Sequence, residues 1–397
     1  MKIKLGVIFG GKTVENEVSI ISAIQAMNNI NQEKYEIIPI YIAKDNSWYT
    51  GKMMDEVDFF TNFDNLKKYA KKVVLYQKDG TFYLQKVTGI KKIVTELDIV
   101  FPIVHGNNVE DGSLQGYLET VGIPYVGPKV IGSALGMDKI IQKQVFTSEN
   151  IPVVPYTWFY DTEYSQNKKA IETEIKKIGL PVIVKPATLG SSVGIKIVKK
   201  IEQLDEAIDE ASRYASKIIV EKVIENLKEV NCSVLGNYDF METSVIEEVL
   251  SSDEILSYKD KYIGGGKGKA SKGMASASRI MPARIDEKLS KQVEEISKKA
   301  FRILNLSGVC RMDFLIDNKT KKIYLNEPNT IPGSLAFYLW KPKGKNYSTL
   351  LDEMITLAIK EYKNNSKKIC NFNTNILSNY NGLKGAKGMK GLKNKVN

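Results

Sequence analysis

The chain has 397 residues, 43% of them hydrophobic and 26% charged, so its composition excludes disorder over most of its length. Lys and Arg outnumber Asp and Glu by 57 to 46, a net charge of +11 that suits an anionic substrate. Five lysines and no acid fall within residues 382–397. We expect residues 366–397 to form a disordered basic tail, and we expect no specific nucleic-acid partner because residues 382–397 contain no aromatic residue.

Cysteine and histidine usage limits the chemistry further. Cys232, Cys310 and Cys370 are few and far apart, which favours a reducing compartment over a disulfide framework. A single histidine, His105, excludes most histidine-rich zinc sites. The sequence has no secretory signal and no stretch of about 20 apolar residues, so we expect a cytoplasmic protein without membrane insertion.

The first region alternates strands and helices. Residues 2–9 and 35–42 have strand patterns, and the apolar spacing from Glu17 onwards is helical. This βαβ unit predicts an α/β fold with a doubly wound parallel sheet. Further strands are expected at 72–77, 81–86 and 98–104, and the domain is expected to comprise residues 1–128.

Two more regions follow before the tail. Residues 129–218 combine a helix from Ser133 into Lys139, two strands around a Gly/Ser loop within 180–199, and a helix at 202–214. Residues 219–365 begin with a strand near 218–221. They continue with a helix at 286–304, strands at 308–316 and 322–329, and a helix at 347–362.

The two late strands carry the most informative polar pattern. Alternation puts Arg311 and Asp313 on one face of the first strand and Glu327 and Asn329 on one face of the second. An antiparallel hairpin turning near Thr320 would place Asp313 opposite Glu327. Carboxylate and amide oxygens suit Mg²⁺ held together with substrate phosphates, although a solvated hairpin face would show the same pattern. Pro328 favours an edge strand.

A Gly/Ser loop follows the strand that delivers Lys185. The segment VKPATLGSSVG, residues 184–194, has the composition of a phosphate cradle, with Ser191 and Ser192 as hydroxyl donors. No Walker A motif occurs in the chain. An ordinary hairpin loop is the alternative interpretation.

Polar residues also follow the strands of the first region. Glu15 starts a helix after Gly10-Gly11, where it could accept a substrate ammonium or simply favour the helix dipole. His105 ends another strand at the same sheet edge, where a structural role is the alternative. The basic, glycine-rich segment 258–274 could be a lid over phosphates or a surface loop.

The order of these motifs is more specific than any one of them. The chain shows GGKTVENEVS, HGNNVEDGSLQG, MDK, VKPATLGSSVG, KY, RMDF and NEPNTIPG in sequence. This order resembles the D-alanine–D-alanine ligase family of the ATP-grasp superfamily from residue 3 to about residue 360. The resemblance implies a three-domain ATP-grasp fold whose N-terminal domain binds substrate, with ATP between the other two domains, and a homodimer.

The resemblance also implies individual roles for nucleotide and metal. The residues it assigns to ATP are Lys139, Lys185, Ser192, Glu221, Glu229 and Lys261. Asp313, Glu327 and Asn329 would bind two Mg²⁺ ions, with Mn²⁺ as a possible substitute. The implied reaction joins two D-alanines through a D-alanyl phosphate, as in peptidoglycan precursor synthesis.

The amino-acid subsites are assigned in the same way. Glu15 would hold the ammonium of the first D-alanine and His105 would lie near its carboxylate. Arg311 and the Gly333 N–H would stabilise the tetrahedral oxyanion. Tyr262 and Ser191 would link to Glu15 and close the lid over the acyl phosphate.

The sequence departs from the family pattern at several positions. Asn16 stands where a basic residue is usual, Val109 where glycine is usual, and Pro328 where an aliphatic residue is usual. The usual Ser-Leu pair for the second substrate is missing from residues 333–344, which leaves Tyr338 and Ser334 as candidates. A D-alanine–D-serine ligase, and less plausibly a non-catalytic ATP-grasp binding protein, therefore stay open as alternatives.

Overall fold

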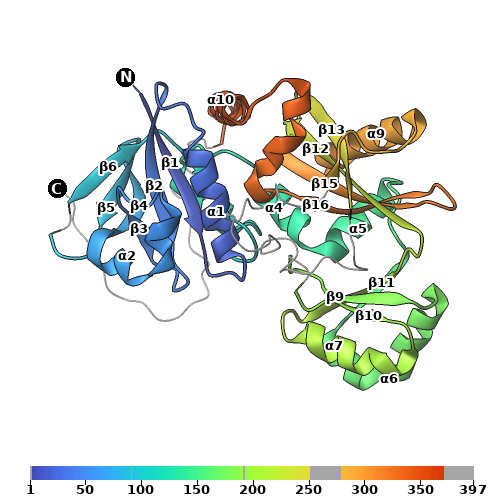
Figure 1. Ribbon diagram of the computed structural model, residues 1–397. Coiled ribbons are helices and arrows are strands. Elements are labelled where there is room, and N and C mark those ends of the chain that lie inside the picture. Colours follow the sequence, from blue (N-terminus) through green and yellow to red (C-terminus); the bar gives the residue numbers. More distant parts are fainter. Residues whose placement is uncertain (1, 91, 191–192, 251–278, 371–397) are drawn as a thin grey trace, which may run out of the picture.

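The computed structural model describes residues 2–90, 92–190, 193–250 and 279–370. Three sheets follow one another along the chain, and helices pack against each of them (Figure 1). Each sheet takes its strands from one part of the sequence. This α/β architecture confirms the predicted fold class in outline.

The N-terminal sheet has seven strands in the order β6-β5-β4-β3-β2-β1-β7. Only the pairs β1–β2 and β1–β7 are parallel, and the remaining neighbours are antiparallel. The sheet is therefore mixed: the predicted parallel arrangement holds for β2, β1 and β7, whereas four of the six neighbouring pairs are antiparallel. The strands are β1 (Ile3–Gly10), β2 (Tyr35–Ile42), β3 (Trp48–Thr50), β4 (Lys71–Lys78), β5 (Thr81–Lys86), β6 (Ile93–Leu97) and β7 (Ile99–Pro102).

A short connection explains the antiparallel pairing of β4 with β5. β4 and β5 are joined by Asp79 and Gly80 alone, both with positive φ. A two-residue turn of this kind can only return the chain antiparallel, because a parallel partner needs a crossover of a dozen residues or more. The parallel half keeps such a crossover, α1 (Asn16–Met27), between β1 and β2. The other helical segments of the N-terminal domain are η1 (Val57–Thr61), α2 (Asp64–Tyr69) and α3 (Ser113–Val121).

The central sheet has four antiparallel strands in the order β10-β9-β11-β8. α6 and α7 cover one face of it (Figure 1). The helix expected from Ser133 into Lys139 is broken at Asp138, whose side chain caps the second half by accepting from two backbone N–H groups. The elements are α4 (Val130–Met137), α5 (Lys139–Ser148), β8 (Tyr156–Tyr160), α6 (Asp161–Ile178), β9 (Val182–Pro186), β10 (Lys196–Val198), η2 (Ile201–Gln203), α7 (Leu204–Ser212) and β11 (Lys217–Lys222).

The third sheet has five antiparallel strands in the order β14-β13-β12-β15-β16. β16 is an edge strand, as Pro328 predicted. Because β11 belongs to the central sheet, the chain changes sheet between β11 and β12, later than the expected boundary at 218/219. The elements are β12 (Leu227–Gly236), β13 (Met241–Val249), β14 (Arg279–Ile280), α9 (Glu287–Ile303), β15 (Gly308–Asp317), β16 (Ile323–Asn329), η4 (Gly333–Leu339), η5 (Lys341–Lys343) and α10 (Tyr347–Asn365).

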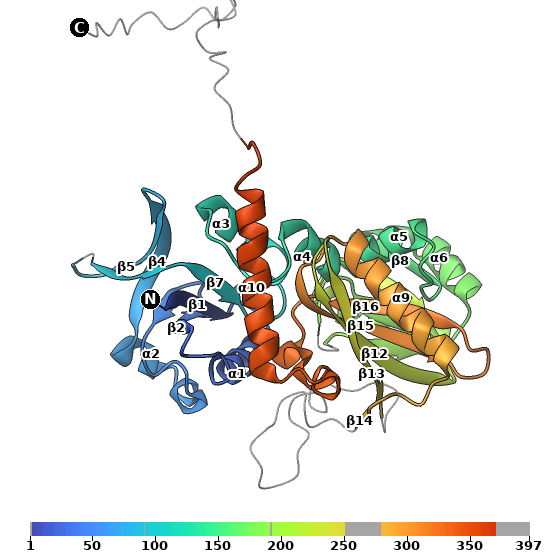
Figure 2. The ribbon, with the colours of Figure 1, turned by 90° about the horizontal axis from the view of Figure 1, so that it is seen from above.

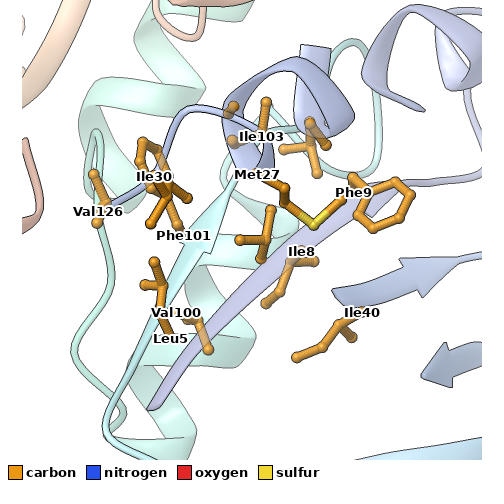
Figure 3. Packing of buried hydrophobic residues seen from close by; sticks show 14 of the residues in the cluster. Leu5, Ile8, Phe9, Met27, Ile30, Ile40, Val100, Phe101, Ile103 and Val126 are labelled. Atoms are coloured by element: carbon orange, nitrogen blue, oxygen red, sulfur yellow. The ribbon is translucent and has the colours of Figure 1, made fainter. Parts of the chain in front are cut away.

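One hydrophobic core joins the two ends of the chain. α10 lies between the N-terminal and C-terminal sheets (Figure 2), and Tyr35 and Lys34 both bond to its Asp352. The buried cluster of the N-terminal sheet, part of which Figure 3 shows, also includes Leu335 and Trp340 from the segment after β16. This packing fixes the position of η4 against α1. None of the described helices is long and apolar enough to span a bilayer.

Candidate active site

Glu15 lies where two loops from different domains meet. It occupies the N-cap position of α1 and is buried. A Cβ atom added to Gly106 would lie 2.8 Å from Glu15 Oε2, and one added to Gly190 would lie 3.0 Å from the same oxygen. The carboxylate is therefore enclosed by the loop after β7 and the Gly/Ser loop after β9. Ser191 and Ser192, next to Gly190, lie outside the described residues.

Two departures from the family pattern have local reasons. Asn16 is buried, donates to the Gly11 carbonyl at 2.7 Å and accepts from the Tyr41 hydroxyl at 3.0 Å. Val109 is also buried, and its methyl groups pack directly over Gly11. Both residues thus brace the loop that precedes Glu15 rather than altering the carboxylate itself.

Glu110, which the sequence analysis did not single out, joins the N-terminal domain to the end of β16. Its carboxyl accepts from the Gly106 N–H at 3.0 Å, the Thr330 hydroxyl at 3.0 Å and the Ile331 N–H at 3.1 Å. Burial, reinforced by the charge of Glu15, raises the pKa of Glu110 to about 8. Glu110 belongs to the HGNNVEDG motif, so it could have been found from its place in that motif.

His105 is enclosed by protein rather than open to solvent. Its Nε2 lies 3.0 Å from the Ser22 hydroxyl, and the ring also bonds to the backbone of Ile331. Burial lowers the pKa of His105 to about 4, so the ring is neutral at physiological pH. Its predicted role near the carboxylate of D-alanine stays a prediction.

Lysines and glutamates form a buried cluster between α5 and the central sheet. Lys185 Nζ donates to Glu221 Oε2 at 2.6 Å, and Lys143 Nζ lies 3.1 Å from Glu221 Oε1. Burial alone would raise the pKa of Glu221, but the two lysines lower it to about 2. Lys139 donates to the Leu189 carbonyl at 2.9 Å and lies 3.2 Å from Glu327. These cations face the Gly/Ser loop and one predicted metal ligand together.

The sequence analysis did not single out Lys143, and it did not predict that Glu221 lies between two lysines. Lys143 lies one helical turn after Lys139 on α5, and this i, i+4 spacing is the signal that could have identified it. Glu221 is held between two lysines, so its predicted contact with adenine stays a prediction. Glu229 contributes to the electrostatic environment of Lys185.

The predicted metal hairpin has the expected register. Asp313 pairs with Glu327 and Arg311 pairs with Asn329. Asp313 accepts from Arg311 through both oxygens at 2.7 Å, and from the Asn329 amide at 2.8 Å. An ionised carboxylate has about four lone-pair sites, so Asp313 can keep these bonds and still bind a cation.

The donor set fits a cation shared with phosphates. No group of three or more His, Cys, Asp or Glu side chains suited to a metal occurs among the described residues. Two carboxylates and one amide therefore need further oxygen ligands from outside the protein. Mg²⁺ characteristically takes such ligands from substrate phosphates and water.

A second buried group lies beside the predicted oxyanion residue Arg311. Glu247, on β13, accepts from Arg279 at 2.8 Å, from Asn231 at 2.9 Å and from the Tyr338 hydroxyl at 3.2 Å. The Arg279 guanidinium lies 3.9 Å from the centroid of the Tyr338 ring. Arg279 thus holds the ring of Tyr338 and Glu247 holds its hydroxyl. The positive charge of Arg311 also acts on the hydroxyl.

The structure brings most of the predicted residues to one region where the three sheets meet. Lys261 and Tyr262, like the two serines, lie outside the described residues, as does the chain beyond residue 370. Gly333 starts η4 four residues after Asn329, directly before Ser334. The roles of all the predicted site residues stay predictions. Glu110, Lys143 and Glu247, which were not predicted, contact the described part of this region at Ile331, Glu221 and Tyr338.

Comparison with known proteins decides the family. The family model for the D-Ala–D-Ala ligase N-terminus matches residues 4–128, and the one for the C-terminus matches residues 145–356. The chain belongs to the D-alanine–D-alanine ligase family. The resemblance drawn from the motifs is confirmed, and this family implies the use of ATP and a divalent metal.

Similarity to individual D-alanine–D-alanine ligases extends over nearly the whole chain. A D-alanine–D-alanine ligase of Thermosipho melanesiensis is 40% identical over 375 residues, which are 94% of this chain and 98% of that protein. The VanG D-Ala:D-Ser ligase of Enterococcus faecalis has a TM-score of 0.75 at 33% identity, covering 90% of this chain and all of the other. The D-alanine–D-alanine ligase of Coxiella burnetii has a TM-score of 0.74 at 30% identity, over 92% and 96% of the two chains.

Proposed function

We propose that this protein joins two D-alanine molecules at the expense of ATP. The observation that carries the proposal is the pairing of Asp313 with Glu327 beside the lysines of the nucleotide side. In the first step the carboxylate of D-alanine attacks the γ-phosphate of ATP, so that D-alanyl phosphate forms and ADP leaves. Asp313, Glu327 and Asn329 would hold two Mg²⁺ ions, which would supply positive charge for the transferred phosphoryl group, and Lys139 and Lys185 would add theirs.

In the second step the amine of another D-alanine attacks the acyl phosphate. Inorganic phosphate leaves as the new C–N bond forms, and the attacking amine loses a proton. Glu15 holds the ammonium of the first D-alanine, while Arg311 and the Gly333 N–H stabilise the tetrahedral oxyanion. No protein nucleophile takes part, which agrees with the raised pKa of the buried thiols Cys232 and Cys310.

The second amino acid is the least constrained part of the proposal. D-alanine is favoured because curated relatives at 36–40% identity are D-alanine–D-alanine ligases. D-serine is the second candidate, because the VanG D-Ala:D-Ser ligase has a similar fold at 33% identity. We further propose a cytoplasmic homodimer, an expectation that rests on the family resemblance and on the use of ATP.

The domain ranges are also proposed rather than measured. Residues 1–128 would bind D-alanine, and ATP would lie between the central and C-terminal domains. We place the boundary between those two domains after β11, because that strand pairs with the central sheet.

Replacement of Glu327 by glutamine tests the metal assignment. Glu327→Gln keeps the shape of the side chain but removes a negative charge that Mg²⁺ needs, so ATP turnover should fall by more than about a hundredfold. Glu242→Gln is a matched control in the same sheet, because Glu242 forms a similar ion pair with Lys345 at similar exposure, 29% against 28% for Glu327. Equal activities of the two variants in phosphate release would contradict the assignment.

A further inference from the structure

The turn that begins η4 has a backbone conformation that ordinary residues avoid. Ser334, Leu335 and Ala336 have φ values of 51°, 52° and 48°, all in the left-handed region. None of the three is glycine, and all are buried. Left-handed conformation normally occurs at single residues, so three in succession require support from surrounding structure.

That support comes from helix α1 of the N-terminal domain. The Ser334 N–H donates to the Ser22 hydroxyl oxygen at 3.0 Å. The Ser334 hydroxyl donates to Gln25 Oε1 at 2.6 Å. Ser22 and Gln25 lie three residues apart on α1, so they present both acceptors from one helix face.

His105 completes the connection. The Ser22 hydroxyl, having accepted from Ser334, can donate its own proton to Nε2 of the neutral ring at 3.0 Å. The other ring nitrogen then carries a proton for the bond to the Ile331 backbone. Every donor in this chain of bonds has an acceptor, and both ends of the chain lie in the segment 331–334.

We propose that Ser22 and Gln25 are positioning residues that hold the left-handed turn 334–336 and thereby set which amino acid the second subsite accepts. The inference rests on the proposed function and on the sequence-based assignment of Ser334 and Tyr338 to the second amino acid. The turn forms the first part of η4, which starts at Gly333, and Tyr338 lies two residues after the turn on the same segment. Glu247 and Arg279 hold the side chain of Tyr338, so a relaxed turn would change the shape of the subsite through the backbone between Ser334 and Tyr338.

The test compares Ser22→Ala with Ser19→Ala. Ser19 is equally buried on the same helix and makes two hydrogen bonds, but these go to Gly10 and Ile103 rather than to the turn. Each protein is given Mg-ATP with D-alanine and enough D-serine for the wild type to form both products. The ratio of D-Ala-D-Ser to D-Ala-D-Ala is read by mass spectrometry. Both products come from the same folded molecules, so the ratio is independent of any loss of folded protein.

Ser22→Ala leaves a buried N–H without an acceptor, so we expect the product ratio to change by about fivefold or more. Gln25→Leu, at a half-buried position, should change it in the same direction, while Ser19→Ala should stay within about twofold of the wild type. Wild-type ratios in both Ser22→Ala and Gln25→Leu would overturn the inference. A wild type that forms no dipeptide would instead contradict the proposed function, so the two failures are distinguishable.

Discussion

At the scale of single residues, the buried carboxyl of Glu110 makes stability depend on pH. Its pKa is about 8 in the folded protein, mainly through burial, against about 4.3 for an exposed glutamate. Between these values the folded state binds one proton more than the unfolded state. The free energy of unfolding that Glu110 contributes therefore falls as pH rises from about 4.5 to about 8.

Urea unfolding of the wild type and Glu110→Gln at pH 5.5, 6.5 and 7.5 measures this contribution. Glutamine does not titrate, so the wild type should lose stability relative to the variant as pH rises. Titration of His105 is common to both proteins and cancels in the difference. A difference in unfolding free energy that stays constant over this range would contradict a raised pKa.

Two lysines allow a buried ion pair to be compared with an exposed one. Lys143 is fully buried against Glu221 at 3.1 Å, whereas Lys168 pairs with Asp205 at 2.6 Å on the surface. Lys143→Met should cost about 1–3 kcal/mol of unfolding free energy, because the buried Glu221 loses one of its two lysine partners and keeps only Lys185 at 2.6 Å. Lys168→Met should cost less than about 1 kcal/mol despite its shorter distance. Equal losses in chemical denaturation would show that the buried pair is not structural.

Residue patterns predicted the hairpin ligands better than they predicted the buried supports. Strict alternation in two apolar strands is enough to place Asp313 opposite Glu327, and the register confirms it. The contacts of Glu110 and Lys143 could not be predicted in this way, because their partners, Ile331 and Glu221, are far away in sequence. Local hydrophobic periodicity does not indicate contacts between such distant residues. Asn16 departs from the usual residue of the family, and the sequence shows that departure, but it does not show the hydrogen bonds of Asn16 to Gly11 and Tyr41.

At the scale of elements, the close contact between two loops can be tested by adding one methyl group. Gly190→Ala would put a Cβ atom 3.0 Å from Glu15 Oε2, forcing the carboxylate or the loop to move. We expect kcat/KM for D-alanine to fall by roughly ten- to a hundredfold, because small misplacements at a reacting centre are costly.

Gly116→Ala provides the control for this substitution. Gly116 lies in α3 with open space around its added Cβ, so alanine there should leave activity unchanged and favour the helix slightly. Similar activity of Gly190→Ala and Gly116→Ala in steady-state kinetics would show that the loop does not approach Glu15 during turnover.

Element prediction failed where turn chemistry decides strand direction. The apolar patterns of β4 and β5 were recognised, but the Asp79-Gly80 turn between them was not used, so the sheet was expected to be parallel. The break between α4 and α5 has a similar origin, because Asp138 caps the second helix. In both cases a signal of one or two residues outweighs the hydrophobic periodicity on either side.

At the scale of the whole molecule, the two ends of the chain share one core. Trp340, after η4, is completely buried in the cluster that also holds Leu5 and Phe9 of β1. Trp340→Ala should therefore destabilise the protein by about 3–5 kcal/mol. Hydrogen exchange of the β1 amides should become faster in the same variant, although β1 lies more than 300 residues away in sequence.

Val293→Ala is the corresponding control in a different core. Val293, on α9, packs in the cluster of the C-terminal sheet and not in that of β1. Its substitution should destabilise the protein while leaving β1 protection closer to that of the wild type. Faster exchange of β1 in the Val293 variant alone would contradict the shared core.

We expect the residues gathered where the three sheets meet to act together as a ligase for D-alanine. The decisive experiment is to incubate the purified chain with Mg-ATP and D-alanine and to measure phosphate release and product mass together. We predict D-alanyl-D-alanine as the product, with one phosphate released for each dipeptide formed. Phosphate release that does not depend on D-alanine, or that occurs without dipeptide, would contradict the account.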